Sequence, residues 1–173
     1  MTDNAAAPDG ATTTPEPETL HGCPVTVSRG QRVVHVPVLR YLEVLRLLVA
    51  DGFDLCTDLT GVDYLTHPGR PLPDGVTPER FEVVLNLIAM GQRERLRVRV
   101  QVPVGAATLP STFDVWPGNE APERETFDMF GIVFEGHPDL SRILMPEDWD
   151  GHPLRKDYDV GAIPVQFRSV AER

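Results

Sequence analysis

The clearest pattern in the chain is an alternation of apolar and polar positions between residues 80 and 104. The stretches RFEVVLNLIAM and RLRVRVQVPV change character at every second residue, with the turn sequence GQRE between them. Because successive side chains of a strand point to opposite faces of a sheet, this pattern predicts a β-hairpin. Two sets of side chains share the second strand: Leu96, Val98, Val100, Val102 and Val104 on one face, and Arg95, Arg97, Arg99 and Gln101 on the other. We expect one packed face and one that meets water or an acidic partner, a solvated face being the simpler interpretation.

Upstream of the hairpin the pattern predicts a strand, a helix and another strand. VVHVPV (33–38) is typical of a short strand, and FDLCTDLTGVDYL (53–65) is rich in strand formers. The intervening stretch has apolar residues at helical spacing and a glycine suited to end a helix; these are Leu39, Leu42, Leu45, Val49 and Gly52. The next 14 residues, THPGRPLPDGVTPE, include four prolines and indicate a loop.

Two helices are predicted downstream of the hairpin. LPSTFDVWPG (109–118) indicates a short helix capped by Ser111. APERETFDMFG (121–131) indicates a second helix, with Pro122 at its first position and Gly131 just past its end.

The second of these helices carries an unusual number of charges. Glu123 and Glu125 would stand in its first turn, where the helix dipole favours acids. Arg124 is four residues before Asp128, a spacing that favours an ion pair, while Phe127 and Phe130 would form an apolar stripe.

Composition limits the class of protein. A length of 173 residues suits one domain, and 17 prolines with 14 glycines disfavour an all-helical bundle. The net charge of −10 argues against a nucleic-acid or anionic-lipid binder. Residues 1–19 are mostly Ala, Thr, Pro, Asp and Glu, and we expect them to form a disordered tail.

Several features bear on location and on metal content. The longest uncharged stretch has 14 residues (100–113), fewer than the roughly 18 to 20 that a helix needs to span a membrane. The N-terminal sequence has neither the basic nor the apolar region of a signal peptide, so we expect the chain in the cytoplasm. Its two cysteines, Cys23 and Cys56, are too few for an ordinary iron–sulfur cluster or an all-cysteine zinc site.

Candidate chemistry is confined to residues 123–159, which hold ten acids and four bases. Two sequences there, EGHPDL and DGHPLR, repeat an acid followed by Gly-His-Pro. His137 and His152, with Asp139 or Asp150, could form a metal site or a general acid–base pair. Alternatively, each His-Pro is a rigid turn whose imidazole binds nearby backbone or a carboxylate. Since the irregular chain between the two histidines gives no reason for them to converge, the structural interpretation is favoured.

Residues 123–158, ERETFDMFGIVFEGHPDLSRILMPEDWDGHPLRKDY, closely resemble the signature of the C subunit of NADH-quinone oxidoreductase, the thirty-kilodalton subunit of respiratory complex I. The upstream pieces DLTGVDYL, RFEVVLNL, VRVQVPV and LPSTFDVWPG occur in the family's order, so the resemblance covers roughly residues 33–160. The resemblance marks the following residues as the family signature and the expected subunit interface: Glu123, Arg124, Glu125, Asp128, Phe130, Gly131, His137, Pro138, Asp139, Arg142, Trp149, His152, Pro153, Arg155, Lys156 and Asp157.

The resemblance also implies an architecture. It implies an α+β fold, a two-layer α/β sandwich with a mixed sheet, followed by a long irregular proline-rich C-terminal segment. We therefore expect a core domain at residues 20–135 and an extended segment at residues 136–173 that packs on partner subunits.

In function, the resemblance implies a non-catalytic structural subunit in the peripheral arm (quinone module) of NADH-quinone oxidoreductase. That enzyme transfers electrons from NADH to quinone and couples the transfer to ion translocation. The chain would bind no metal or cofactor itself, whereas the assembled complex would hold NADH, FMN, iron–sulfur clusters and quinone. Its partners would be the large quinone-site (D) subunit and the neighbouring small iron–sulfur subunit, at the cytoplasmic face of the cell membrane.

Three alternatives stay open, one of them a soluble binding module outside any respiratory complex. The chain could be the equivalent subunit of a related complex: a coenzyme F420 dehydrogenase, a plastid-type dehydrogenase or a membrane-bound hydrogenase. It could also be a free-standing acid–base or metal enzyme that uses His137 and His152.

The charged residues of the signature suggest how a subunit interface would be built. We expect Arg124, Asp128, Arg142, Arg155, Lys156 and Asp157 to form ion pairs within the chain and between subunits. Trp116 and Trp149 could anchor a partner or cover the domain's own core, and the sequence favours neither.

Overall fold

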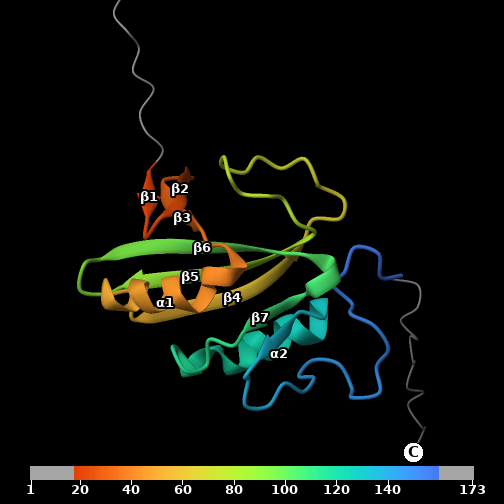
Figure 1. Ribbon diagram of the computed structural model, residues 1–173. Coiled ribbons are helices and arrows are strands. Elements are labelled where there is room, and N and C mark those ends of the chain that lie inside the picture. Colours follow the sequence, from red (N-terminus) through yellow and green to blue (C-terminus); the bar gives the residue numbers. More distant parts are fainter. Residues whose placement is uncertain (1–17, 160–173) are drawn as a thin grey trace, which may run out of the picture.

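One mixed sheet of six strands organises the chain, in the order β1-β2-β3-β6-β5-β4 (Figure 1). The structure is a computed structural model, and it describes residues 18–159. Neighbouring strands are antiparallel except β3 and β6, which are parallel, with Arg32 opposite Leu96. The strands of this sheet are β1 (Thr19–Leu20), β2 (Cys23–Ser28), β3 (Gln31–His35), β4 (Leu55–Asp63), β5 (Phe81–Ala89) and β6 (Glu94–Val102).

The predicted hairpin is confirmed as β5 and β6, and so is the expected α+β fold with a mixed sheet. Alternate residues of both strands are fully buried, from Phe81 to Ala89 and from Leu96 to Val102. They point to one face of the sheet and form its apolar core with residues of both helices. The helices therefore lie on a single face.

The first helix, α1 (Tyr41–Ala50), buries a different stripe from the one that its spacing predicts. A short 3-10 turn, η1 (Val38–Arg40), precedes it and leaves the Leu39 side chain 98% exposed. Tyr41, Val44, Leu45 and Leu48 are the helical residues that are buried against the sheet. The prediction was wrong at Leu39 because the turn changes the direction of the chain before the α-helix begins.

The predicted helix at 109–118 is also wrong. The segment begins in strand β7 (Thr108–Pro110), makes a turn and ends in a 3-10 helix, η3 (Pro117–Asn119). A further 3-10 turn, η2 (Val104–Ala106), precedes β7, and β7 pairs in parallel with β8 (Val133–Glu135). Trp116 is extended, as expected for a residue before proline, and this prevents a continuous helix. Its side chain is buried in the domain's own core.

The second helix, α2, runs from Glu120 to Phe130, so it begins two residues before Pro122. A proline is tolerated in the first helical turn, where amide groups have no partner within the helix. Gly131 ends the helix at a φ of 71°, in the left-handed region that glycine adopts without strain. The predicted end of the helix at Gly131 is confirmed, whereas the prediction that Pro122 is its first residue was wrong.

Two observations concern the ends of the chain and its relation to membranes. The expected tail, residues 1–19, falls mostly outside the described residues, and its last residue, Thr19, already belongs to β1. Within residues 18–159, neither helix has the length and apolar character that crossing a membrane requires.

Gly61 provides a test of how α2 is seated on the edge strand β4. A Cβ atom at this position would lie 2.7 Å from Cδ2 of Phe130 on α2, too close for a real contact. Gly61→Ala is therefore expected to destabilise the fold by about 1–3 kcal/mol, as overpacking does, in a urea titration. Gly69→Ala is the matched control, because no atom lies within 4 Å of its Cβ position. Equal stability of the two variants would contradict this seating.

Candidate functional site

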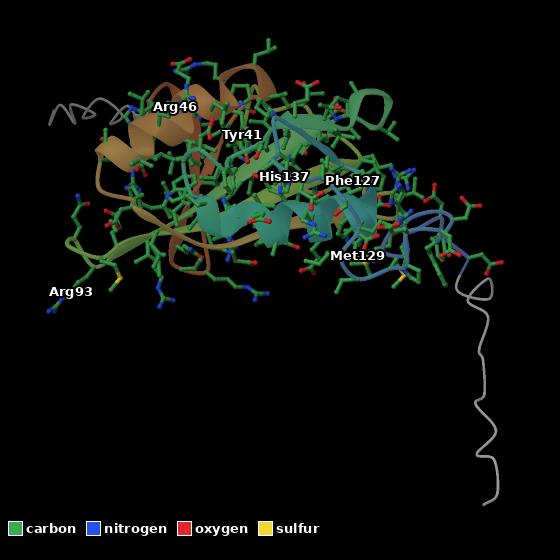
Figure 2. The ribbon with its side chains drawn as sticks, turned by 90° about the horizontal axis from the view of Figure 1, so that it is seen from below. Tyr41, Arg46, Arg93, Phe127, Met129 and His137 are labelled. Carbon is green, nitrogen blue, oxygen red and sulfur yellow. The ribbon has the colours of Figure 1, made fainter. Side chains whose placement is uncertain are left out.

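The signature residues lie on α2 and on the irregular segment that follows β8. Residues 136–159, which form neither helix nor strand, run along α2 and return to the end of β4 (Figure 1). Figure 2 shows Phe127 and Met129 on α2, with His137 at the start of this segment. We call residues 136–159 the C-terminal segment.

Asp128 fixes the path of this segment. Its carboxylate is fully buried and accepts hydrogen bonds from the backbone amides of Ile143 (3.1 Å), Leu144 (2.8 Å) and Met145 (2.8 Å). The Arg142 guanidinium donates to the other oxygen at 2.5 Å. Burial alone would raise the pKa of Asp128, but these four donors outweigh it and hold the pKa below its ordinary value of 3.8. The predicted ion pair of Asp128 thus lies within the chain, with Arg142.

Two arginines organise the backbone carbonyls of the same turn. Arg142 also donates to the carbonyls of Trp149 (2.9 Å) and Gly151 (3.0 Å). Arg124 donates to the carbonyl (3.1 Å) and the hydroxyl (2.8 Å) of Ser141 and to the Arg142 carbonyl (3.0 Å). The prediction that Arg124 pairs with Asp128 was wrong, because the returning chain offers both residues other partners.

Glu123 ties α2 to β7 and is fully buried. Its carboxylate accepts from the Ser111 hydroxyl (2.6 Å) and from the amide (2.7 Å) and hydroxyl (2.6 Å) of Thr112. Ser111, expected as a helix cap, is therefore a partner of this acid. Glu125, two residues later on the helix, is exposed.

Each imidazole of the two Gly-His-Pro sequences binds backbone. His137 Nε2 lies 3.0 Å from the Glu120 carbonyl oxygen, and its Nδ1 accepts from the Asp139 amide at 3.0 Å. His152 Nδ1 lies 2.9 Å from the Asp128 carbonyl oxygen, and its ring packs edge-on against Phe127. The described residues hold no group of three or more His, Cys, Asp or Glu side chains that could bind a metal ion.

A second buried carboxylate, Asp63, holds the far end of the C-terminal segment. It accepts from both Nε (3.1 Å) and Nη2 (2.8 Å) of Arg80 and from the backbone amides of Leu65 and Lys156, each at 2.9 Å. Arg80 also reaches Asp157 at 2.6 Å. Burial raises the pKa of Asp63, but the hydrogen bonds reverse this and lower it overall. The hydrogen bond from Arg80 likewise lowers the pKa of Asp157.

Arg155 completes this corner. Its Nε donates to the Phe130 carbonyl at 2.6 Å, one of the last carbonyls of α2, and its guanidinium lies over the Phe81 ring at 5.2 Å. A Cβ atom on Gly131 would collide with Arg155 and His152. Gly131 is thus required both for its left-handed backbone and for the close approach of these two side chains.

Some apolar side chains of the C-terminal segment are exposed, although their backbone is held by hydrogen bonds. Ile143, Leu144 and Leu154 are 40%, 56% and 48% exposed, and the amides of the first two are among those that Asp128 holds. Several acids stand on the same segment: Asp139, Glu147, Asp148 and Asp150. We call the set of Ile143, Leu144 and Leu154 the apolar ledge.

The opposite face of the sheet has a buried polar cluster that sequence reasoning missed. Glu82 on β5 is fully buried, and it accepts from Arg99 at 2.5 Å and from the side-chain amide of Gln101. Arg70, from the proline-rich loop, approaches Glu82 at 3.9 Å and stacks on the Tyr64 ring at 3.6 Å. The loop therefore covers part of the predicted arginine row, with Arg99 half-buried beneath it.

His35 on β3 adjoins this cluster and is almost completely buried. Its Nε2 lies 2.9 Å from the Thr26 hydroxyl. Burial, reinforced by the nearby Arg99 charge, lowers the pKa of His35 from 6.5 to about 4. The only sequence signal for this histidine is its place inside an apolar strand, which resembles that of any satisfied core residue.

The charged side chains of the signature are thus mainly structural within the chain. Among the described residues, the signature groups Glu123, Arg124, Asp128, Arg142 and Arg155 each bind a backbone or side-chain partner of this chain. These hydrogen bonds position the backbone around α2.

Comparison with known proteins agrees with the signature. Residues 34–163 match the family model described as "Respiratory-chain NADH dehydrogenase, 30 Kd subunit". The C subunit of NADH-quinone oxidoreductase from Roseiflexus castenholzii is 48% identical over 148 residues, covering 84% of this chain and 79% of that protein. The corresponding protein of Saccharopolyspora erythraea is 44% identical over 149 residues, again 84% of this chain. The chain spans just 56% of the length of this second relative.

Solved structures share the fold. A trypsin-resistant fragment of Nqo5 is 41% identical, with a TM-score of 0.61, over 69% of this chain and 90% of that one. A chain of the membrane-bound sulfane sulfur reductase, an archaeal respiratory membrane complex, gives a TM-score of 0.67 over 87% of this chain and 89% of that one. At 24% identity, this second likeness concerns the fold alone.

Asp128→Asn tests the first anchor. Since it leaves Arg142 without its buried carboxylate partner, it is expected to lower the free energy of unfolding at pH 7 by about 3 kcal/mol. The folded-state pKa lies below 3.8, so the stabilisation is present above that pH and is lost as the pH falls through the folded value. The difference between the two proteins should therefore shrink in acid. Asp148→Asn, an exposed acid of the same segment, should change stability little at either pH.

His35→Gln tests the buried imidazole. Because the unfolded chain binds a proton near pH 6.5 and the folded chain only near pH 4, the wild type should lose up to about 3 kcal/mol between these values. Burial also lowers the pKa of His152, which acts in the same direction, so the substitution should reduce this loss without removing it. Denaturant titrations of both proteins from pH 7 to pH 4 measure this loss of stability. An unchanged pH dependence in the variant would contradict the assignment.

Proposed function

The chain belongs to the 30 kDa subunit family of respiratory-chain NADH dehydrogenase, and we propose that it serves in the peripheral arm of NADH-quinone oxidoreductase as a structural subunit without catalytic groups. The complex would transfer electrons from NADH to quinone and couple this to ion translocation. In this role the chain contributes shape and contacts to the quinone module.

The observation that carries this proposal is that charged residues of the signature bind partners within the chain itself. Asp128, Arg142 and Arg124 use their hydrogen-bonding capacity to hold residues 141–151 against α2. A catalytic centre needs groups that remain free to bind substrate or exchange protons. An assembly subunit needs a rigid surface, because ordering a flexible surface on binding lowers affinity.

The partner surface is proposed to centre on the apolar ledge. Its side chains are held in solvent by backbone that Asp128 anchors, and acids stand beside them on the same segment. Apolar side chains with a polar rim are typical of protein interfaces. The proposed partners are the large quinone-site (D) subunit and the neighbouring small iron–sulfur subunit. The buried signature residues would act on this interface by fixing the backbone that presents the ledge.

Cofactors are proposed to belong to the partners. NADH, FMN, the iron–sulfur clusters and quinone would be held elsewhere in the complex, at the cytoplasmic face of the membrane. The donor set of this chain agrees with that division, since it has only two cysteines and the imidazoles of His137 and His152 bind backbone.

Affinity purification of the chain tests the proposal. The tagged chain would be expressed from its own locus, purified from membranes in mild detergent, and assayed for co-purifying subunits, iron and NADH-quinone activity. Recovery of the other complex I subunits with iron and activity is the expected result. Recovery with a hydrogenase or an F420 dehydrogenase would place the chain in a related complex. Isolation of the chain alone with a metal or an activity would favour a free-standing enzyme.

The apolar ledge supplies a sharper prediction. Replacing Ile143 and Leu144 together by Asp should abolish co-purification of the partner subunits, because it places two charges in an apolar contact. The change should leave the fold intact, since the two residues are 40% and 56% exposed and their backbone amides, which the change keeps, are what binds Asp128.

The matched control is Leu39→Asp, at an apolar residue that is 98% exposed but lies before α1 and away from the ledge. Circular dichroism of the purified variants verifies folding. Normal assembly of the Ile143/Leu144 variant, or equal failure of the control, would contradict the proposed surface.

A further inference from the structure

Two arginine-tipped hairpins meet at the end of the sheet farthest from the C-terminal segment (Figure 1). The β2–β3 turn carries Arg29 and the β5–β6 turn carries Arg93. The turns are neighbours because β3 and β6 pair in parallel. Figure 2 shows Arg93 at this outermost tip, well away from Phe127 and Met129 on α2.

Both tip arginines have a backbone conformation that disfavours them. Their φ angles are 52° at Arg29 and 56° at Arg93, in the left-handed region where glycine or asparagine is the usual residue. His21 has a similar φ of 50°, but its ring pairs with Asp51 at 2.6 Å. The two-residue turn Arg29-Gly30 requires a positive φ, so an arginine stands there although glycine or asparagine would adopt the angle more readily.

Among residues 18–159, the charge at these tips has no acidic partner. Between residues 18 and 159, no carboxylate forms an ion pair with Arg29, Arg93 or Arg95, and all three lie at the surface. The neighbouring Arg32 differs, because it pairs with both Glu18 and Glu94 at 2.8 Å. The described part of a chain of net charge −10 thus gathers three arginines without an ion-pair partner at one place.

The tips enclose a groove that continues along the polar face of β6. A hollow of about 520 Å³ lies between the two turns, and its charged lining consists of Arg29, Arg32, Arg93, Arg95 and Glu94. A second hollow of about 390 Å³ shares Gln31 and Arg95 with the first and extends to Arg97 and Asn86. The two hollows together form one elongated groove, which we call the track, rather than a pocket for one small ion.

We propose that this track binds an acidic, extended segment of a protein partner. Aspartate and glutamate side chains would pair with Arg29, Arg93 and Arg95, which present planar guanidinium groups suited to carboxylates. The position at the far end of the sheet allows this contact while the apolar ledge is occupied by another partner.

The whole-molecule charge favours a short segment over a larger anion. A bilayer surface or a nucleic acid spreads negative charge over an area comparable with the protein, so it meets repulsion from the net charge of −10. A segment confined to the groove interacts mainly with charges within a Debye length of about 8 Å at physiological salt. The charged side chains that line the groove between the turns are four arginines and one glutamate.

Fluorescence anisotropy with a labelled decapeptide of alternating Glu and Ser tests this proposal on the full chain. We expect saturable binding at 50 mM NaCl that weakens at 300 mM. The corresponding Lys and Ser peptide is the charge control, and its signal should not depend on Arg29 and Arg93. Arg29→Gly combined with Arg93→Gly should weaken binding about fivefold or more, because each exposed ion pair contributes up to a few-fold. Arg46→Gln, on the exposed side of α1, should leave binding unchanged (Figure 2).

The glycine variants also separate lost binding from lost folding. Because glycine suits a positive φ, the double variant should melt at the same temperature as the wild type or higher. Unchanged peptide affinity in this variant, or absence of peptide binding to the wild type at 50 mM NaCl, would overturn the proposal. Binding to phosphatidylserine vesicles in place of the peptide, lost in the double variant, would overturn it in favour of a lipid surface.

Discussion

A carboxylate that is withdrawn from water must have its hydrogen bonds supplied by the protein, and this requirement at Asp128 governs the part of the molecule that follows α2. Three consecutive amides and one guanidinium meet it, and they can do so only if residues 142–145 turn tightly beside the helix. Residues 142–145 have no regular secondary structure, so their backbone is held by hydrogen bonds to one side chain instead of by pairing between strands. The apolar ledge owes its position to that turn.

Three buried acids connect parts of the sequence that are far apart. Glu123 joins α2 to the residues after β7, Asp128 joins α2 to the C-terminal segment, and Asp63 joins β4 to the end of that segment. Each accepts from at least one backbone amide and at least one side chain. Within the signature, Asp128, its partner Arg142 and the amides of residues 143–145 therefore form one structural unit.

Local patterns in the sequence predicted the elements whose packing is set by their own periodicity. The hairpin of β5 and β6, the existence of α1 and the end of α2 at Gly131 follow from alternation, helical spacing and glycine chemistry. The helix expected at 109–118 does not form. Its first residues pair with β8, a strand that lies beyond α2 in the sequence, and Trp116 is extended before Pro117. At the site, the signature located the important residues but not their partners. Glu82, His35 and Arg70 lacked any local signal, since a polar residue in a strand looks the same whether it meets water or a folded-back loop.

The hydrogen bond between Asp63 and the Lys156 amide spans 93 positions, and this separation has a consequence for the order of folding. During synthesis from the N-terminus, the six sheet strands and both helices leave the ribosome before the residues that close the corner beside β4. Long-range closure of this kind comes late, because the loop loses its entropy before the contact forms. The sheet can therefore assemble while Asp128 and Asp63 still face water, and both carboxylates become buried only when residues 142–156 fold back on them. In this order, the exposed apolar residues Ile143 and Leu144 take up their positions only after the sheet and both helices have formed.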